Sequence, residues 1–206
     1  MNQNKKPSLY DFEVLSLGGE KVSLSLLQGK ILLIFNSAIH SSLASAFYPF
    51  LERIYLQHKR DGFEILDFPS NSFMGEAPES SKEIDEYCRK TFNTTFPRFE
   101  KIELTGENIS PLFTYLCKAK RFEGFDKGNV LSPVLSIRYL KKGPGWDKEI
   151  GVKWNFTFFL VGRDGKVKKR LEATTSEEKI ERSLLHLLDT GPLLTEEEEE
   201  KKEENQ

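Results

Sequence analysis

The chain has 206 residues, 38% of them hydrophobic, which is enough to build the buried core of one domain. A formal net charge of −2 leaves most of the chain nearly neutral, so it offers no electrostatic footprint for nucleic acid. Two cysteines argue against a disulfide-stapled scaffold, and the lack of a long apolar run excludes a membrane span, so we expect a cytoplasmic protein.

The first third of the chain predicts a short hairpin and two core strands with a helix between them. The segment "GGEKVSL" (18–24) is a turn followed by a short strand, which we assign to an N-terminal β-hairpin. The segments "KILLIFN" (30–36) and "GFEILDFPS" (62–70) are strands, and the unbroken apolar run of the first suits a sheet covered on both faces. Between them, "PFLERIYLQHK" predicts a helix that begins at Pro49, because a proline N–H is not needed at the first helical position.

Two helices and a long loop are predicted next. The helix in "PESSKEIDEYCRKTF" has Ser80 or Ser81 as its N-cap, and the helix in "SPLFTYLCKAK" has Ser110 as its N-cap with a proline after it. Residues 121–151 are rich in Gly, Pro and Lys, which indicates a long surface loop in which only 131–140 is a candidate for order.

The chain then predicts a hairpin and a last helix. In "NFTFFLVGRDGKVKKRLEA", two strands flank a tight turn at Asp164 and Gly165, and "TSEEKIERSLLHLL" has the periodicity of a closing helix. The basic cluster "KVKKR" (166–170) lies on the second strand of the hairpin, where lysines commonly protect an exposed sheet edge. With Lys141 and Lys142 it could instead form a modest positive patch, and we favour edge protection.

This order of elements predicts one α/β domain with a central mixed sheet flanked by helices. We place the domain at residues 9–190, after a flexible N-terminus at 1–8. Residues 191–206 end in "TEEEEEKKEENQ", with seven Glu and two Lys, a composition that cannot bury enough apolar surface to offset ordering. We therefore predict a disordered acidic tail.

The stretch "FNSAIHSSLASAFYPF" (35–50) is the first candidate for a functional loop, because it joins a core strand to a helix. It offers Ser41, Ser42 and His40, but no cysteine. A serine hydrolase would need a base within reach of the serine and an acid that orients the base. Adjacent side chains in an extended loop tend to point apart, and no acidic partner for His40 is evident nearby, so the residues disfavour this chemistry.

Several segments, in order and spacing, resemble the glutathione peroxidase family. They cover roughly Leu9 to Leu188, and the long loop at 121–151 is the main interruption. The segments are "LYDFEVLSLGGEKVSLSLLQGKILLIFN", "GFEILDFPSNSFMGEAPES", "TFPRFEKIELTGENISPLFTYL", "VKWNFTFFLVGRDGKVKKR" and "TTSEEKIERSLLHLL". The resemblance implies a thioredoxin-like fold, which agrees with the order of elements above.

The family resemblance also implies a catalytic tetrad, and this chain departs from it at the centre. The family places a selenocysteine or cysteine where "NSAIHSS" has Ser41, with Ser42 as the alternative register. It places a Gln where "FPSNSF" has Ser72, and only its Trp-Asn pair is matched, by Trp154 and Asn155. A serine hydroxyl has no sulfenic-acid chemistry, so it cannot replace the chalcogen in peroxide reduction.

Cys88 and Cys117 leave a second function open, that of an atypical thiol-dependent peroxidase. Some thioredoxin-dependent members of the family carry a resolving cysteine close to the position of Cys88, one residue away in register. A cysteine on an amphipathic helix is more often a small buried hydrophobe, and we favour that role for both thiols. Glutathione would then be a reductant only if the protein is active, and no His or Cys spacing matches a metal site.

We therefore predict a glutathione-peroxidase-like protein that is catalytically impaired and has a binding or structural role. Its partner would be an unidentified protein, contacted through the tail or the long loop. The chain would be a monomer or an oligomer of the kind that the family forms. The Trp154 and Asn155 pair would persist mainly because it packs the loop that carries it.

Overall fold

Strand β3 (Ile31–Ser37) is the centre of the molecule, and all seven of its residues are buried. In the computed structural model, which describes residues 7–141 and 143–190, it pairs in parallel with β4 (Phe63–Pro69). On its other side it pairs antiparallel with β5 (Phe158–Val161), and β5 pairs antiparallel with β6 (Val167–Leu171). The sheet order β4-β3-β5-β6 confirms a mixed sheet, with β6 at one edge.

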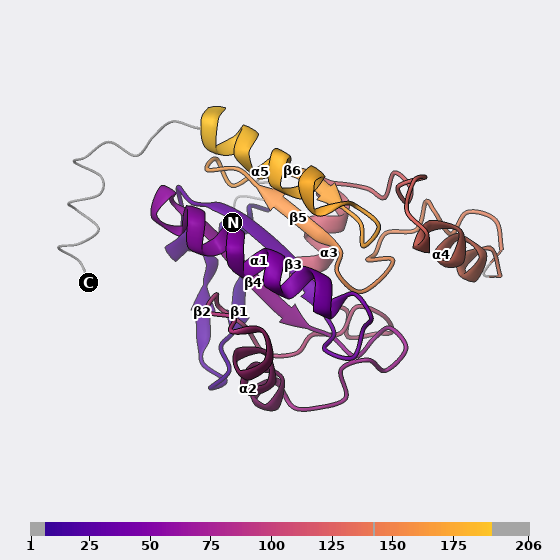
Figure 1. Cartoon of the computed structure of the whole chain (residues 1–206), viewed down its shortest axis with the longest axis horizontal. Coiled ribbons are helices and arrows are strands. Elements are labelled where there is room, and N and C mark those ends of the chain that lie inside the picture. The colour runs from indigo at the N-terminus through magenta and orange to yellow at the C-terminus, as the bar shows by residue number, and fades with distance from the viewer. Residues whose placement is uncertain (1–6, 142, 191–206) are drawn as a thin grey trace, which may run out of the picture.

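The alternation of side chains along β3 divides the core into two layers. Leu33 and Phe35 face helix α1 (Ala44–His58), while Leu32 and Ile34 face helix α3 (Pro111–Ala119). Helices α1 and α5 (Glu177–Thr190) lie in front of the sheet and α3 lies behind it (Figure 1). The unbroken apolar run of β3 therefore exists because both faces of the strand are covered.

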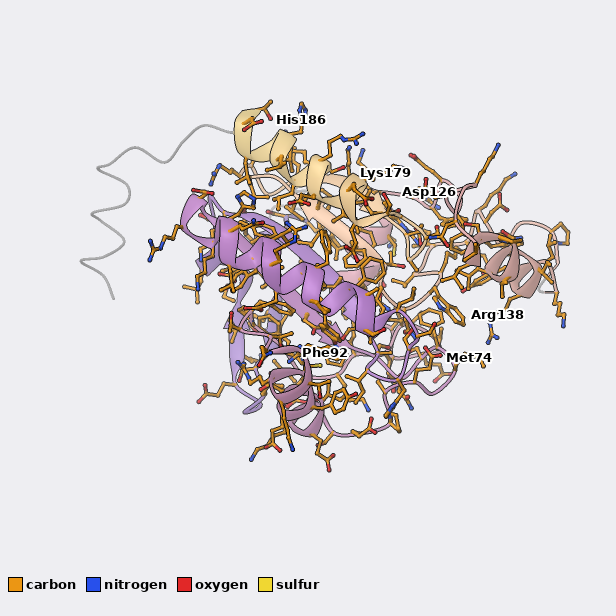
Figure 2. The ribbon with its side chains drawn as sticks, in the orientation of Figure 1. Met74, Phe92, Asp126, Arg138, Lys179 and His186 are labelled. Atoms are coloured by element: carbon orange, nitrogen blue, oxygen red, sulfur yellow. The ribbon has the colours of Figure 1, made fainter. Side chains whose placement is uncertain are left out.

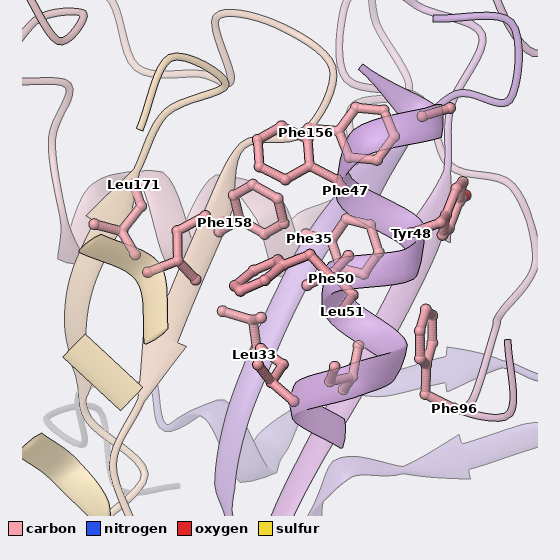
Figure 3. Packing of buried hydrophobic residues seen from close by; sticks show 14 of the residues in the cluster. Leu33, Phe35, Phe47, Tyr48, Phe50, Leu51, Phe96, Phe156, Phe158 and Leu171 are labelled. Carbon is pink, nitrogen blue, oxygen red and sulfur yellow. The ribbon is translucent and has the colours of Figure 1, made fainter. Parts of the chain in front are cut away.

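Aromatic rings fill the layer between α1 and the sheet. Figure 3 shows Phe35 and Phe158 from the sheet meeting Phe47 from α1, and Phe156 closing the cluster. The Phe47 ring lies 5.3 Å from that of Phe156 and 5.1 Å from that of Phe158, in stacked and edge-on geometry respectively. Such pairs add to the stability that buried apolar area supplies.

Helix α1 begins five residues earlier than expected, so the predicted start at Pro49 is wrong. The helix runs from Ala44, and Pro49 lies inside it with no N–H to offer the carbonyl of Ser45. Phe47, Leu51 and Ile54 are all buried in the core on the α1 side. Burial of this face stabilises the helix enough to offset the hydrogen bond that the proline removes.

The N-terminal hairpin is present and packs on the α3 side of the sheet. It consists of β1 (Glu13–Leu15) and β2 (Lys21–Ser23), preceded by a short helical turn, η1 (Leu9–Asp11), and followed by η2 (Leu24–Leu27). Ser8 caps η1 and forms a capping box with Asp11, so ordered contacts begin one residue before the predicted boundary. Residues 1–6 and the predicted disordered tail at 191–206 lie outside the described residues.

The predicted caps of two helices are confirmed. Ser80 caps α2 (Ser81–Phe92) and forms a capping box with Glu83, and Ser110 caps α3 just before Pro111. A short turn, η3 (Lys59–Asp61), ends at Gly62, whose φ of 76° is the left-handed conformation that glycine adopts easily. Both cysteines lie on these two helices, Cys88 on α2 and Cys117 on α3.

The segment 121–151 is more ordered than a surface loop. It contains helix α4 (Leu131–Leu140), which projects away from the sheet (Figure 1). Its buried side is anchored by Tyr139, whose hydroxyl donates to the carbonyl of Lys153 and whose ring lies 4.8 Å from that of Trp146. The other side exposes Val134 and Ile137, each about 60% exposed. The helix coincides with residues 131–140, the one part of the segment that the sequence marked as a candidate for order.

Candidate functional site

Three connecting segments meet at one end of the sheet and define the candidate site. They follow β3, follow β4 and precede β5, which places the predicted site residues close in space. Glu76, from the second segment, joins the other two. Its backbone carbonyl accepts from the N–H of His40 at 2.9 Å, and its carboxylate accepts from Asn155 Nδ2 at 2.8 Å. No local pattern in the sequence marks Glu76 for this central role.

Ser41 lies just before α1 and is 6% exposed. Its Oγ accepts from the N–H of Leu43 at 3.5 Å, and its carbonyl accepts from the N–H of Ala44 at 3.0 Å. A helix N-terminus stabilises an anion, and a thiolate at this position would gain from it. A serine hydroxyl gains little because it stays protonated in the physiological pH range.

Ser72 is turned toward the segment beyond it, rather than toward Ser41. Its Oγ accepts from the N–H of Leu104 at 2.9 Å and from the hydroxyl of Ser70 at 3.0 Å. These bonds tie the segment after β4 to residues 101–105 and give the Ser72 hydroxyl a structural role. Among the described residues, no hydrogen bond links Ser72 to Ser41, Trp154 or Asn155.

Asn36, at the end of β3, holds the Trp154 and Asn155 turn in place. Its Nδ2 donates to the carbonyl of Trp154 at 3.3 Å, and its Oδ1 accepts from the N–H of Thr157 at 3.2 Å. Its own carbonyl accepts from the N–H of Phe156 at 2.8 Å. One fully buried side chain and its backbone thus fix three consecutive peptide groups of the turn.

The same turn contains a strained residue. Phe156 has a φ of 61° although it is not glycine, and its side chain is fully buried. This conformation costs of order 1–3 kcal/mol and persists only where surrounding contacts determine it. Here the ring packs against Phe35 and Phe47, and the backbone N–H is held by Asn36.

Trp154 and Asn155 are held by contacts within the protein. The Trp154 ring is half-buried, lies 5.7 Å from the ring of Phe73 and has the guanidinium of Arg138 from α4 5.1 Å from its centre. Asn155 is fully buried and donates to Glu76. The Asn155 amide is therefore directed at a carboxylate, which would repel an anionic nucleophile placed beside it.

The expectation that His40 lacks an acidic partner is wrong. His40 Nε2 lies 2.6 Å from Glu79 Oε1, and this contact lowers the pKa of the Glu79 carboxyl. The imidazole is exposed and faces the segment before α2. Within the described part of the chain, no hydrogen bond joins it to Ser41, so the acid and the base are present without a serine aligned to them.

The two thiols lie on opposite faces of the sheet and are not part of the site. Cys88 is fully buried in the core on the α1 side, and Cys117, 1% exposed, is buried in the core on the α3 side. Burial raises the pKa of each thiol to about 11. Both are therefore protonated near neutral pH and too enclosed to attack a peroxide.

The described residues contain neither a metal-binding cluster nor a membrane-spanning helix. No group of three His, Cys, Asp or Glu side chains is placed to hold a metal ion there. In the same residues, no helix is long and apolar enough to cross a membrane.

The sheet, the helices on both of its faces and the loop that joins β3 to α1 define a thioredoxin-like protein. Two solved structures share this arrangement. The crystal structure of Trgpx in apo form superposes with a TM-score of 0.62 at 28% identity, covering 90% of this chain and 99% of that one. The structure of T. cruzi GPX1 gives 0.61 at 27% identity, covering 89% of this chain and 97% of that one.

The chain belongs to the glutathione peroxidase family. The family model for glutathione peroxidase matches residues 9–117. A glutathione peroxidase homolog of Neisseria meningitidis is 42% identical over 180 residues, which cover 87% of this chain and 99% of that protein. The resemblance seen in the sequence is thus confirmed at the level of family and fold.

Proposed function

We propose that this glutathione-peroxidase-like protein does not reduce peroxides and has a non-catalytic, binding or structural role. The observation that carries the proposal is the position of its two thiols. The loop between β3 and α1 offers only serine hydroxyls, and both thiols of the chain are buried on the two faces of the sheet. Reduction of a peroxide through a protein nucleophile needs an accessible thiolate or selenolate.

The remaining side chains of the site support the same proposal. The hydroxyl of Ser72 accepts from Leu104 and Ser70, and the amide of Asn155 donates to Glu76. These polar groups stabilise the loops around them and are not aimed at the Ser41 hydroxyl. In this proposal the polar groups of the site stabilise the folded structure, and Trp154 contributes by packing between Phe73 and Arg138.

The second candidate function is an atypical thiol peroxidase that acts through Cys88 or Cys117, with glutathione or thioredoxin as the reductant. Cys88 on α2 is the stronger candidate, because it lies one residue from the position of the resolving cysteine in the family members that the sequence resembles. Its burial and the raised pKa of its thiol count against it. It would require α2 to move away from α1 before the thiol could react.

A peroxide-consumption assay separates the two functions. The full chain is incubated with hydrogen peroxide or an organic hydroperoxide, and with either glutathione or a thioredoxin system. We expect consumption at the rate of the reductant alone. Turnover that disappears in Cys88→Ser but persists in the matched variant Cys117→Ser would replace our proposal with the thiol-peroxidase function.

The proposed compartment and assembly follow from the same features. The cytoplasm suits a chain whose two cysteines are unpaired and lie in separate cores. A protein partner is the proposed ligand, and the chain would act as a monomer or in a family-like oligomer. Sedimentation of the purified chain across a range of concentrations tests the assembly.

A further inference from the structure

A positively charged cleft lies beside the edge strand β6, on the side away from β5. It has a volume of about 430 Å³ and is lined by seven cationic and three anionic side chains. The lining comes from β6, from the first turn of α5 and from the segment that leads out of α3 at residues 120–127. We call this the β6 cleft.

Some of the charges in the β6 cleft neutralise each other. Arg170 pairs with Glu172 at 2.5 Å, and both side chains are almost fully buried. Lys179 of α5 pairs with Asp126 at 2.7 Å, and Figure 2 shows these two residues near the start of α5. These two ion pairs join the segments that form the cleft, and the other cationic side chains of the lining are not neutralised by them.

Four cations of the cleft have no carboxylate within ion-pair distance in the described part of the chain. They are Lys120, Arg121, Lys127 and Lys169. Lys120 is half-buried and the other three are exposed. Like charges gathered around a cleft repel one another, and a bound anion relieves that repulsion.

Protection of the sheet edge does not account for this cluster. Lysines on an edge strand discourage pairing with another strand, and this explains Lys168 and Lys169 on β6. Lys120, Arg121 and Lys127 belong to a different segment, which is not a strand, yet they converge on the same cleft. The convergence points to an anionic ligand.

We propose that the β6 cleft is the docking site for the glutamate run of the chain's own C-terminal segment, Glu196–Glu200. The exposed carboxylate of Glu123 in the same lining offsets at most one of the four cations, and five consecutive glutamates supply negative charge for the others. The two lysines that follow, Lys201 and Lys202, set the run apart from Glu203 and Glu204. No other stretch of the sequence has five consecutive acidic residues.

The length of the C-terminal segment suits this position. Helix α5 carries Lys179 in its first turn, at the cleft, and ends 11 residues later at Thr190. Figure 2 places His186 toward the far end of the helix from Lys179. The distance back is about 17 Å at 1.5 Å per helical residue. Six extended residues, 191–196, span about 20 Å, so the glutamates can return to the cleft.

Tethering makes a weak attraction effective. A short linker gives an attached segment an effective concentration in the millimolar range, so docking within one chain needs only modest affinity. The contact would be sensitive to salt, since exposed charges are screened over about 8 Å at physiological ionic strength. An acidic protein segment that competes for the cleft would have to displace the chain's own glutamates.

Carbodiimide cross-linking of the full chain tests the proposal. The reagent joins a carboxylate to a lysine amine only where the two are in contact, and peptide mass spectrometry identifies the pair. We expect Glu196–Glu200 to link to Lys120, Lys127 and Lys169 far more often than to Lys82 and Lys90, which are exposed on α2. The excess should fall several-fold between 0.05 M and about 0.5 M salt.

Two outcomes of this experiment would overturn the proposal. One is an even distribution of cross-links over the exposed lysines. The other is cross-links that join differently isotope-labelled copies in a mixed sample, which would assign the cleft to a second copy's segment.

A binding measurement provides an independent test. A fluorescent peptide, Thr195–Gln206, is titrated with the full chain and with a full-length variant in which Glu196–Glu200 are all replaced by Gln. We expect the variant to bind the peptide at least 10-fold more tightly, because its cleft is vacant. The further change Lys120→Glu with Lys127→Glu should abolish this binding, whereas Lys82→Glu with Lys90→Glu should leave it intact. The docking site would be contradicted if the unchanged chain and the Gln variant bound the peptide with equal affinity. It would also be contradicted if the two pairs of lysine substitutions had equal effects.

Discussion

Asn36 shows how a single buried residue can hold together the turn that carries the Trp154 and Asn155 pair. Its side chain and carbonyl hold Trp154, Phe156 and Thr157, and so keep the turn that positions Asn155. This function depends on hydrogen bonds alone and does not require a nucleophile at Ser41. These contacts give the Trp154 and Asn155 pair a structural role that is independent of any nucleophile.

Replacement of Asn36 should be costly for this reason. In Asn36→Ala, the N–H of Thr157 loses its buried acceptor and the carbonyl of Trp154 keeps only the Thr157 hydroxyl as a donor, and we expect a loss of about 2–4 kcal/mol in the free energy of unfolding. Urea unfolding measures it. Asn71→Ala, at an exposed residue whose Oδ1 accepts only from the N–H of Ala77, serves as the control and should lose about 1 kcal/mol or less. Similar losses in the two variants would contradict the role assigned to Asn36.

The two thiols are expected to be inert in the folded chain. A thiol with a pKa of about 11 is about 0.1% ionised at pH 8, and burial blocks the reagent as well. Reaction with a disulfide reagent at pH 8 should therefore proceed for Cys88 and Cys117 only after denaturant is added. Rapid modification of Cys88 in native buffer would show that α2 opens and would favour the thiol-peroxidase function.

At the scale of elements, the ends of helices and turns were predictable where a local side chain determines them, and were not predictable where tertiary packing determines them. The caps at Ser80 and Ser110 and the turn at Asp164–Gly165 were predictable because one side chain or one glycine specifies each. The start of α1 was not predictable from local sequence. The burial of Phe47 stabilises helical turns on both sides of Pro49, although proline disfavours the interior of a helix.

The candidate site was predictable only in part for a similar reason. The positions of Ser41, Ser72, Trp154 and Asn155 followed from segments that match the family. Their partners did not, because Glu76 is far from Asn155 in the sequence, and Glu79 is far from His40. No local pattern marks a hydrogen bond between residues so distant along the chain.

A substitution in helix α1 tests whether Pro49 destabilises the helix by removing a backbone hydrogen bond. Because Pro49 is exposed and lacks an N–H for Ser45, Pro49→Ala should raise the free energy of unfolding by about 1–2 kcal/mol. Ser45→Ala, on an exposed position of the same helix, should change it by at most about 0.5 kcal/mol. A destabilised Pro49→Ala would mean that the ring makes contacts that outweigh the hydrogen bond.

At the scale of the whole molecule, buried thiols make stability depend on pH. Their pKa is raised from 9.0 to about 11 by folding, so above pH 8 the unfolded chain releases protons that the folded chain keeps. The unfolded state therefore binds fewer protons, and the free energy of unfolding falls as pH rises.

This dependence can be measured by urea unfolding at pH 7.5 and pH 9.5 under reducing conditions. The decrease should be about 0.8 kcal/mol for each thiol over this interval. Cys88→Ala and Cys117→Ala, although destabilised by the cavities they create, should each reduce this decrease by about 0.8 kcal/mol, and the buried and half-buried tyrosines supply the remainder. An unchanged slope in the double variant would assign the pH dependence to other groups.

The most direct test of the central claim, that the fold keeps no peroxide-reactive thiol, is the mass of the cysteine peptides and of the full chain after brief exposure to a small excess of hydrogen peroxide without any reductant. We predict no change of mass at either cysteine, confirmed by peptide mapping, because both thiols are buried and protonated. Rapid gain of one oxygen at Cys88 or Cys117, or loss of two hydrogens through a disulfide between them, would contradict the account.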